Sequence, residues 1–309
     1  MVEHEFFNAT GDIPYNMTND YMFRVILQEN KEATKGLLCA VLRLKPEDIK
    51  TVVIENPIKL GERVDAKDFY LDISITLNNH TSINLEMQVV NKLNWTDRSL
   101  SYISRNFADQ NKGDDYIYAK PVIHIGFLDY TLFKDSPEFY TTYKLMNVKN
   151  HKIFNDKFFI GVVDLNRTDL ATDEDKEYHL DDWVRLFKAK TWEELKMIAD
   201  KAPELLEASK SMYEYNADTD MRQRCIARME YINDMKRMEK LSDAVSFLES
   251  EKEKLTSEKE KLTSEKEKLT SEKEKLTSEK EQLASKNELL SEKLQHLEKI
   301  LLDNGISVD

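Results

Sequence analysis

Two short segments carry acidic and amide side chains whose types and spacing could support metal-dependent chemistry. Phe69–Leu77 and Ile83–Val90 both alternate apolar with polar residues, which predicts two half-buried strands. Asp72 takes a polar position in the first strand, and Glu86 and Gln88 take polar positions in the second. Because side chains on a strand alternate between its faces, these three polar groups are expected on one face of a hairpin.

The length of the turn between the two strands determines which acidic residues face each other across the hairpin. A three-residue loop at Asn78–His80 pairs the apolar positions of the two strands and places Asp72 opposite Glu86. Two adjacent carboxylates repel each other, and a divalent cation between them removes the cost. Mg²⁺, with Mn²⁺ as the alternative, prefers such oxygen ligands and can activate water toward a phosphodiester. Gln88 could orient water or phosphate but cannot act as a base. The plain alternative is the polar outer face of an ordinary sheet.

Two helices carry further candidate groups. Thr18, Asn19 and Asp20 offer capping side chains to the first helix, and Asp20 either helps to cap it or points to the metal as a third acid. Arg98 and Tyr102 lie one helical turn apart on a polar helix face that suits phosphate binding or simple solvation.

Hydrophobic patterning predicts a mixed α/β domain followed by helices. His124, in an apolar strand, is expected to be a buried core histidine. The predicted order is helix, three strands, helix, strand and then additions, with helices around Met22–Ile26, Leu37–Leu42, Thr96–Asn111 and from Tyr178 onward, and strands at Thr51–Glu55, Phe69–Leu77, Ile83–Val90, Pro121–Leu128, Phe139–Val148 and Lys157–Val163.

Composition excludes several classes of protein. The 309 residues carry a net charge of −13, of which residues 251–309 contribute only −3, so a general basic coat for nucleic acid is absent. The two cysteines lie far apart, which suits a reducing cytoplasm, and no apolar run is long enough to span a bilayer. No glycine-rich phosphate loop is present, so no nucleotide cofactor is expected.

A sevenfold leucine period marks the C-terminal segment. Four copies of KLTSEKE fill residues 254–281, and leucine recurs every seven residues from Leu241 to Leu297. With leucine at heptad position d, lysine occupies position a through the repeats, and Leu294 and Leu301 take position a near the end. This pattern predicts a coiled coil that joins copies of the chain into a homo-oligomer. A solvated single helix or spacer is the alternative.

The segments LDISITLNNHTSINLEMQV (71–89), NDYMFRVIL (19–27) and RSLSYISRNFADQNKGDDYIYAKPVIHIGFLDY (98–130) together resemble one known family. It is the recombination-promoting nuclease and transposase family of the PD-(D/E)XK nuclease superfamily. The resemblance covers about residues 12–240. It implies a restriction-endonuclease-like α-β-β-β-α-β core around a central mixed sheet, and metal-dependent hydrolysis of DNA.

The resemblance also implies roles for individual residues. The family's motif aspartate falls on Asp72, and its ExQ falls on Glu86 and Gln88, with Gln in place of the superfamily's Lys. The acid of the first helix falls on Asp20, and its basic residue falls on Arg24, where Lys is more usual. The Arg-and-Tyr pattern of the second helix falls on Arg98 and Tyr102. Asp72 and Glu86 are thus expected to hold Mg²⁺ or Mn²⁺, with Gln88 and Asp20 assisting, while Arg24, Arg98 and Tyr102 bind DNA.

Three parts are expected along the chain: a nuclease-like domain at 1–165, a helical extension at 166–240 and a heptad coiled coil at 241–309. The function that this organisation predicts is a cytoplasmic, metal-dependent DNA endonuclease of recombination or transposase type. The alternative is a catalytically inactive nuclease-like protein that assembles with partners through its coil.

Overall fold

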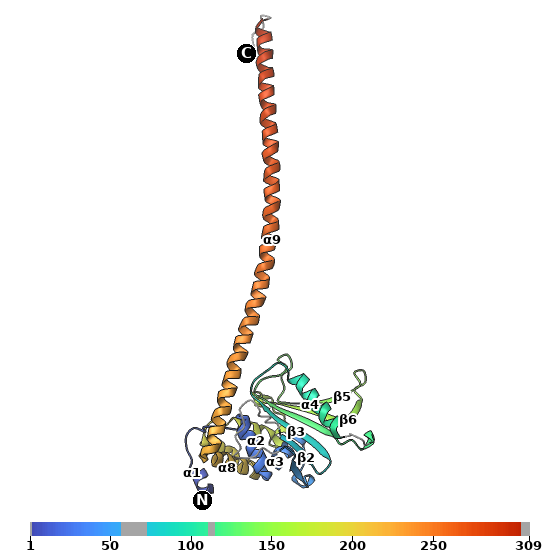
Figure 1. The fold of residues 1–309 in the computed structure, drawn as a ribbon, viewed down its shortest axis with the longest axis vertical. Coiled ribbons are helices and arrows are strands. Elements are labelled where there is room, and N and C mark those ends of the chain that lie inside the picture. The colour runs from blue at the N-terminus through green and yellow to red at the C-terminus, as the bar shows by residue number, and fades with distance from the viewer. Residues whose placement is uncertain (1, 57–72, 111–114, 304–309) are drawn as a thin grey trace. The chain divides into compact units, whose positions relative to one another are not determined.

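A computed structural model describes residues 2–56, 73–110 and 115–303 (Figure 1). Six strands form one mixed sheet in the order β1-β2-β3-β4-β6-β5. The strands are β1 Val52–Ile54, β2 Ile73–Leu77, β3 Thr81–Gln88, β4 Val122–Leu128, β5 Tyr140–Met146 and β6 Ile153–Asp164. The α-helices are α1 Val2–Asn8, α2 Asp20–Glu29, α3 Lys31–Leu42, α4 Trp95–Gln110, α5 Asp173–Glu177, α6 Leu180–Lys188, α7 Trp192–Ala199, α8 Pro203–Ala217 and α9 Thr219–Asp303.

The predicted core order is confirmed. Helices α2 and α3 precede the antiparallel strands β1, β2 and β3, and α4 then crosses to β4, which runs parallel to β3. Strands β5 and β6 pair antiparallel, also as expected, and β6 runs parallel to β4. The expected strand part 69–72 and the end of the second helix at residue 111 lie outside the described residues.

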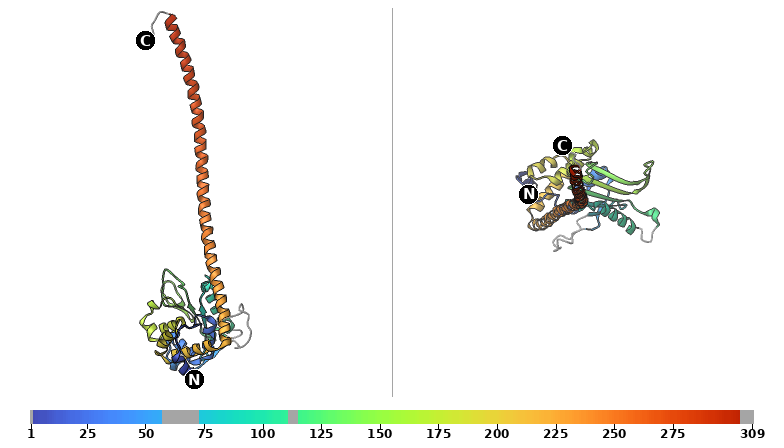
Figure 2. Two further views of the ribbon diagram at one scale, coloured as in Figure 1. Left: turned by 90° about the vertical axis from the view of Figure 1, so that its left-hand side faces the viewer. Right: turned by 90° about the horizontal axis from the view of Figure 1, so that it is seen from above.

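Helices cover both faces of the sheet (Figures 1 and 2). On one face α2 and α6 bring aromatic rings onto β4: Phe23, Phe127 and Phe187 lie with centroids 5.4–5.6 Å apart. On the other face Trp95 at the start of α4 packs with Leu128 and Val162. Position 126 must be glycine for this packing, because a Cβ there would lie 2.4 Å from Cζ2 of Trp95.

The helices after residue 165 share the first of these hydrophobic cores. Trp183, Leu195 and Leu205 are fully buried in the same cluster as the side chains of α2 and α3. Residues 1–239 form one compact unit, and residues 240–309 form a second. None of the helices in the described part of the chain combines the length and apolar character needed to cross a bilayer.

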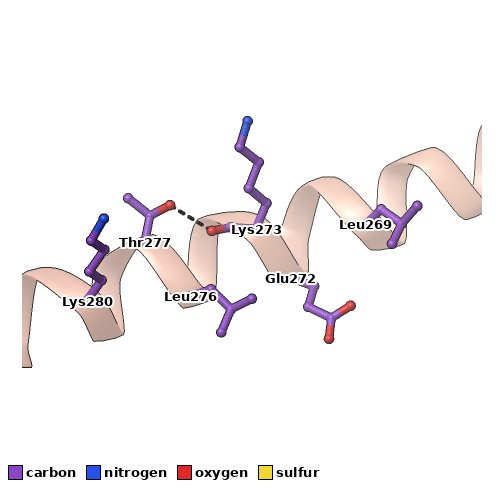
Figure 3. Close-up of a pocket in the computed structure, with 6 residues that line it drawn as sticks. All are labelled: Leu269, Glu272, Lys273, Leu276, Thr277 and Lys280. Atoms are coloured by element: carbon purple, nitrogen blue, oxygen red, sulfur yellow. Dashed lines mark hydrogen bonds between the residues drawn. The ribbon is translucent and has the colours of Figure 1, made fainter.

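The second unit, as far as it is described, consists of the continuation of α9, which has neither Gly nor Pro from Thr219 to Asp303. Its repeated threonines bond to their own helix: Oγ1 of Thr277, like that of Thr256, Thr263 and Thr270, donates to the carbonyl four residues earlier at 2.8 Å (Figure 3). The predicted long helix is therefore present, whereas its pairing with another helix stays a prediction.

Candidate active site

The β2–β3 hairpin has the expected register. Ile73 pairs with Leu85 and Leu77 with Thr81, so a three-residue loop joins the strands. Asn78 and Asn79 allow this turn because both adopt a left-handed backbone, with φ of 53° and 57°. Asp72, the expected metal ligand before β2, lies outside the described residues.

The acid and the amide of the ExQ triplet share one cation. Arg98, on α4, donates from Nη2 to Oε1 of Glu86 and to Oε1 of Gln88. The amide of Gln88 is fixed from its other end, because Nε2 donates to the carbonyl of Val90 at 2.9 Å. The structure thus brings three predicted site residues together, with a guanidinium between the two oxygens.

A histidine from the neighbouring strand completes the cluster. His124 is 1% exposed and pairs with Asn84 in the parallel β3–β4 register. Asn84 Nδ2 lies 3.0 Å from Nδ1 of His124. Since an amide nitrogen can only donate, Nδ1 accepts and the ring proton of the neutral histidine sits on Nε2. That nitrogen lies 3.5 Å from Oε2 of Glu86.

Two aromatic rings hold His124 in place. Tyr102 stacks on the imidazole with centroids 5.8 Å apart and an interplanar angle of 6°, and Trp95 lies 5.7 Å away. Tyr102 was expected to contact DNA, and the structure places it against the site histidine. The prediction of a buried His124 is confirmed, but its approach to Glu86 was missed. Only the register between β3 and β4 reveals it, and a 33-residue crossover separates those strands in the chain.

Asp20 lies on α2, away from this cluster. The N-cap of α2 is Asn19, whose Oδ1 accepts from the amides of Tyr21 and Met22. The Asp20 carboxylate also interacts with the amides of residues 20 and 21, which fits the expectation that it helps to cap the helix. Asp20 occupies the first helical position, where its carboxylate forms a bidentate pair with Arg228, Nε to Oδ1 being 2.6 Å. Burial raises the pKa of Asp20, and Arg228 opposes that rise.

Arg24 is fully buried on the same helix. Its Nη2 donates to the carbonyl of Asn56, whose side-chain Oδ1 accepts from the amide of Ser74 at 2.8 Å. These contacts tie α2 to the start of β2. Helix α2 packs in the core on the opposite face of the sheet from Glu86, so Asp20 and Arg24 stand apart from the other predicted site residues.

The chemistry of this donor set fits a hard cation. Oε2 of Glu86 is buried and makes no hydrogen bond among the residues described. A buried carboxylate oxygen left in this way is costly unless a cation or a donor approaches it. The described residues contain no group of three His, Cys, Asp or Glu side chains that could hold a metal by themselves. A complete metal site here therefore requires a further ligand, which is the part expected of Asp72.

Comparisons with known families agree with this fold. The profile of the PD-(D/E)XK nuclease family transposases matches residues 17–242, which is most of the chain. The profile named FAZ1, C-terminal, matches residues 239–269 and 256–290, both within the first part of the long helix and its repeats. Neither the curated proteins nor the solved structures include one that matches this chain significantly.

Proposed function

The chain belongs to the PD-(D/E)XK nuclease family transposases, and we propose that it hydrolyses phosphodiester bonds in DNA with the help of Mg²⁺ or Mn²⁺. One observation carries the proposal: Glu86, a fixed amide and an arginine meet at the carboxyl end of β3, and the buried Oε2 of Glu86 has no hydrogen bond among the residues that the structure describes. Such an oxygen is a suitable ligand for a divalent cation.

Glu86 and Asp72 would hold the ion in this proposal. The bound ion would polarise the phosphate and lower the pKa of the attacking water. Gln88 presents its Oε1 toward the ion's side of the site, because Val90 holds the other end of the amide. His124 lies beside the Glu86 carboxylate, with Nε2 3.5 Å from Oε2, and would limit the orientations that this carboxylate can take. We assign Asp20 an assisting role through Arg228, by fixing the start of α2 against α9.

We propose that Arg98 has different partners in the presence and in the absence of a divalent cation. In the structure its guanidinium neutralises Glu86 and donates a hydrogen bond to Gln88. With a divalent cation bound to Glu86, Arg98 would be free to bind a DNA phosphate, for which its planar fork of N–H donors is well suited. Its side chain is 28% exposed, so the guanidinium can reach solvent without unfolding α4. Tyr102 and Arg24 were predicted as DNA contacts. We retain Tyr102 beside the site, and we propose that Arg24 braces α2 against Asn56, whose side chain binds the amide of Ser74 in β2.

Plasmid cleavage tests the proposal. Wild-type protein with Mg²⁺ or Mn²⁺ is expected to cut, and Glu86→Gln and Asp72→Asn are expected to lose about 100-fold or more of that activity, because each keeps its shape but loses a charged ligand. Glu47→Gln, at an exposed acid in the short 3-10 helix Pro46–Asp48, is the matched control and should cut normally. Undiminished cutting by Glu86→Gln would refute the assignment.

The same Arg98 contacts favour a second candidate function. If the guanidinium never leaves Glu86 and Gln88, the domain is a nuclease-like interaction module without activity. Calorimetry separates the two readings. An active site binds Mn²⁺, and Arg98→Gln binds it more tightly because a competing cation is gone. An inactive module binds no Mn²⁺ in either form.

Assembly through the C-terminal helix is also part of this proposal. Nine leucines at heptad position d, from Leu241 to Leu297, are at least half exposed in the single chain. Burying each one is worth about 1 kcal/mol, whereas association costs about 4–15 kcal/mol, so nine leucines from each of two copies suffice. We therefore propose a homo-oligomer built on this helix.

A further inference from the structure

We infer that the C-terminal helix pairs with a second copy of this chain in parallel and in register, and that Asn287 selects this arrangement. The inference starts from the exposed stripe. The nine position-d leucines between Leu241 and Leu297 are 50–66% exposed on a helix whose other exposed side chains are mostly charged or small and polar, with Phe247 and Leu289 among the exceptions. A second helix of the same period is the occupant that matches such a stripe along its whole length.

The helix surface has shallow depressions into which side chains of a partner helix could pack. One shallow depression is lined by Leu269 and Leu276 at d, Lys273 and Lys280 at a, Glu272 at g and Thr277 at e (Figure 3). A second, one heptad earlier, has the same composition. In a coiled coil each knob inserts into such a hole formed by side chains around the seam. Depressions on other sides of the helix are lined mainly by Glu, Lys, Ser and Gln.

Charge complementarity favours the parallel direction. In each repeat a glutamate at g directly precedes a lysine at a, as in Glu258 and Lys259. In a parallel pair, each position a neighbours position g of the partner, so the lysine stem covers the seam and its ammonium reaches the partner's glutamate. An antiparallel pair instead brings the g glutamates of the two helices toward each other, where like charges repel.

The four repeats by themselves leave the register open. Because they are identical, sliding one helix by seven residues restores every contact within them. Asn287 breaks this symmetry, since it is the position a that follows Lys280 and lies between Leu283 and Leu290. In register, the two Asn287 amides face each other, and each can donate to and accept from the other. Out of register, each amide faces a lysine or an apolar layer and loses that partner.

Apolar layers close both ends of the seam. Met238 and Val245 take position a before the repeats, and Leu294 and Leu301 take it after them. These layers meet their own copies only in register, so they act with Asn287. Because chain connectivity joins both copies of residues 1–239 to the same end of a parallel coil, the pair offers two copies of the proposed site to one DNA.

Disulfide trapping tests the direction and the register without metal or DNA, so its failure is distinct from failure of the nuclease proposal. Leu283→Cys, at position d, is expected to form an interchain disulfide in most of the full-length protein under mild oxidation, since facing d positions come within disulfide reach. Ser285→Cys, two residues on at the outer position f, is the matched control and should stay monomeric on a non-reducing gel. Wild type reports the background from the buried Cys39 and Cys225. Equal trapping of the two variants, or none in Leu283→Cys, overturns the inference.

Light scattering and one further variant test Asn287. Wild type is expected at twice the chain mass of 36.3 kDa. Asn287→Leu should still associate, but the trapping yield of Leu283→Cys in that background should fall by half or more as other registers and larger assemblies form. A wild-type mass of one chain overturns the pairing, and an unchanged yield in the Asn287→Leu background overturns the role of Asn287.

Discussion

The two units of the chain treat charged side chains in opposite ways. In residues 1–239, Glu86 and Asp20 are largely buried and each is paired with an arginine from another element, Arg98 on α4 and Arg228 on α9. From residue 240 to residue 302 every charged side chain is exposed. The burial of a charged side chain and its partner therefore matter more than the residue type. They decide whether the charge contributes to stability, can serve as a metal ligand, or is simply solvated on the helix surface.

The largest expected difference between the two units is in the alkylation rate of their cysteine thiols. Burial raises the pKa of Cys225 to about 12, and the Asp20 carboxylate adds to the effect. At pH 8 only roughly 1 in 10,000 of these thiols is ionised, against about a quarter for an exposed cysteine of ordinary pKa. Alkylation by iodoacetamide, followed by mass spectrometry of the peptides, should be over about 1,000-fold slower at Cys225 than at Ser278→Cys on the C-terminal helix. Similar rates would show that Cys225 is accessible. Urea should abolish the difference.

The next largest expected effect is the loss of stability when the buried partner of an acidic side chain is removed. Arg228→Ala leaves the Asp20 carboxylate buried without its cation, which is expected to cost about 3–5 kcal/mol of unfolding free energy. Lys268→Ala, at the outer position c of the exposed helix, should change stability by less than about 0.5 kcal/mol. Urea unfolding followed by tryptophan fluorescence measures both, because all three tryptophans lie in residues 1–239.

The pH dependence of this loss has a defined sign. The pKa of Asp20 is already raised above 3.8 by burial, and removal of Arg228 raises it further. A raised pKa in the folded state means that stability falls as the pH rises from 3.8 through the folded pKa. The cost of Arg228→Ala should therefore shrink toward pH 4 and grow toward pH 7. A cost that is constant with pH would show that Asp20 does not carry the effect.

Local patterns in the sequence were enough for much of this fold. The parity of the apolar positions determined the hairpin register, because a slip of one residue would turn Ile73 and Leu85 outward. The helix–strand order followed from hydrophobic periods of about 3.6 and 2 residues. Repetition of leucine every seven residues predicted the long C-terminal helix.

Contacts between distant segments could not be predicted in this way. The Asp20–Arg228 pair joins residues 208 apart, and nothing near Asp20 marks that partner. His124 reaches Glu86 because two parallel strands align after a helical crossover, and their register is not marked by any local pattern in the sequence. In both cases tertiary packing decides, so the side chains around the site were harder to foresee than the strand that carries it.

The His124 contact offers a finer test of the buried cluster. His124→Phe keeps the ring between Tyr102 and Trp95 but removes both nitrogens, so Glu86 loses its orienting neighbour. A loss of about 10–100-fold in Mn²⁺ affinity is expected, which is typical when the group that orients a metal ligand is removed. The exposed His80→Phe is the control. Wild-type affinity in His124→Phe, with an unchanged melting temperature, would assign the histidine to packing alone.

Mn²⁺ binding followed by electron paramagnetic resonance tests the central claim most directly, because it measures the Glu86 site without DNA or turnover. We expect one saturable Mn²⁺ site per chain in wild type and in the exposed control Glu47→Gln, and loss of that site in Glu86→Gln. If Glu86→Gln binds Mn²⁺ as wild type does, or if wild type shows no saturable site, then Glu86 is not a metal ligand and the cluster at the end of β3 is not the centre of a nuclease.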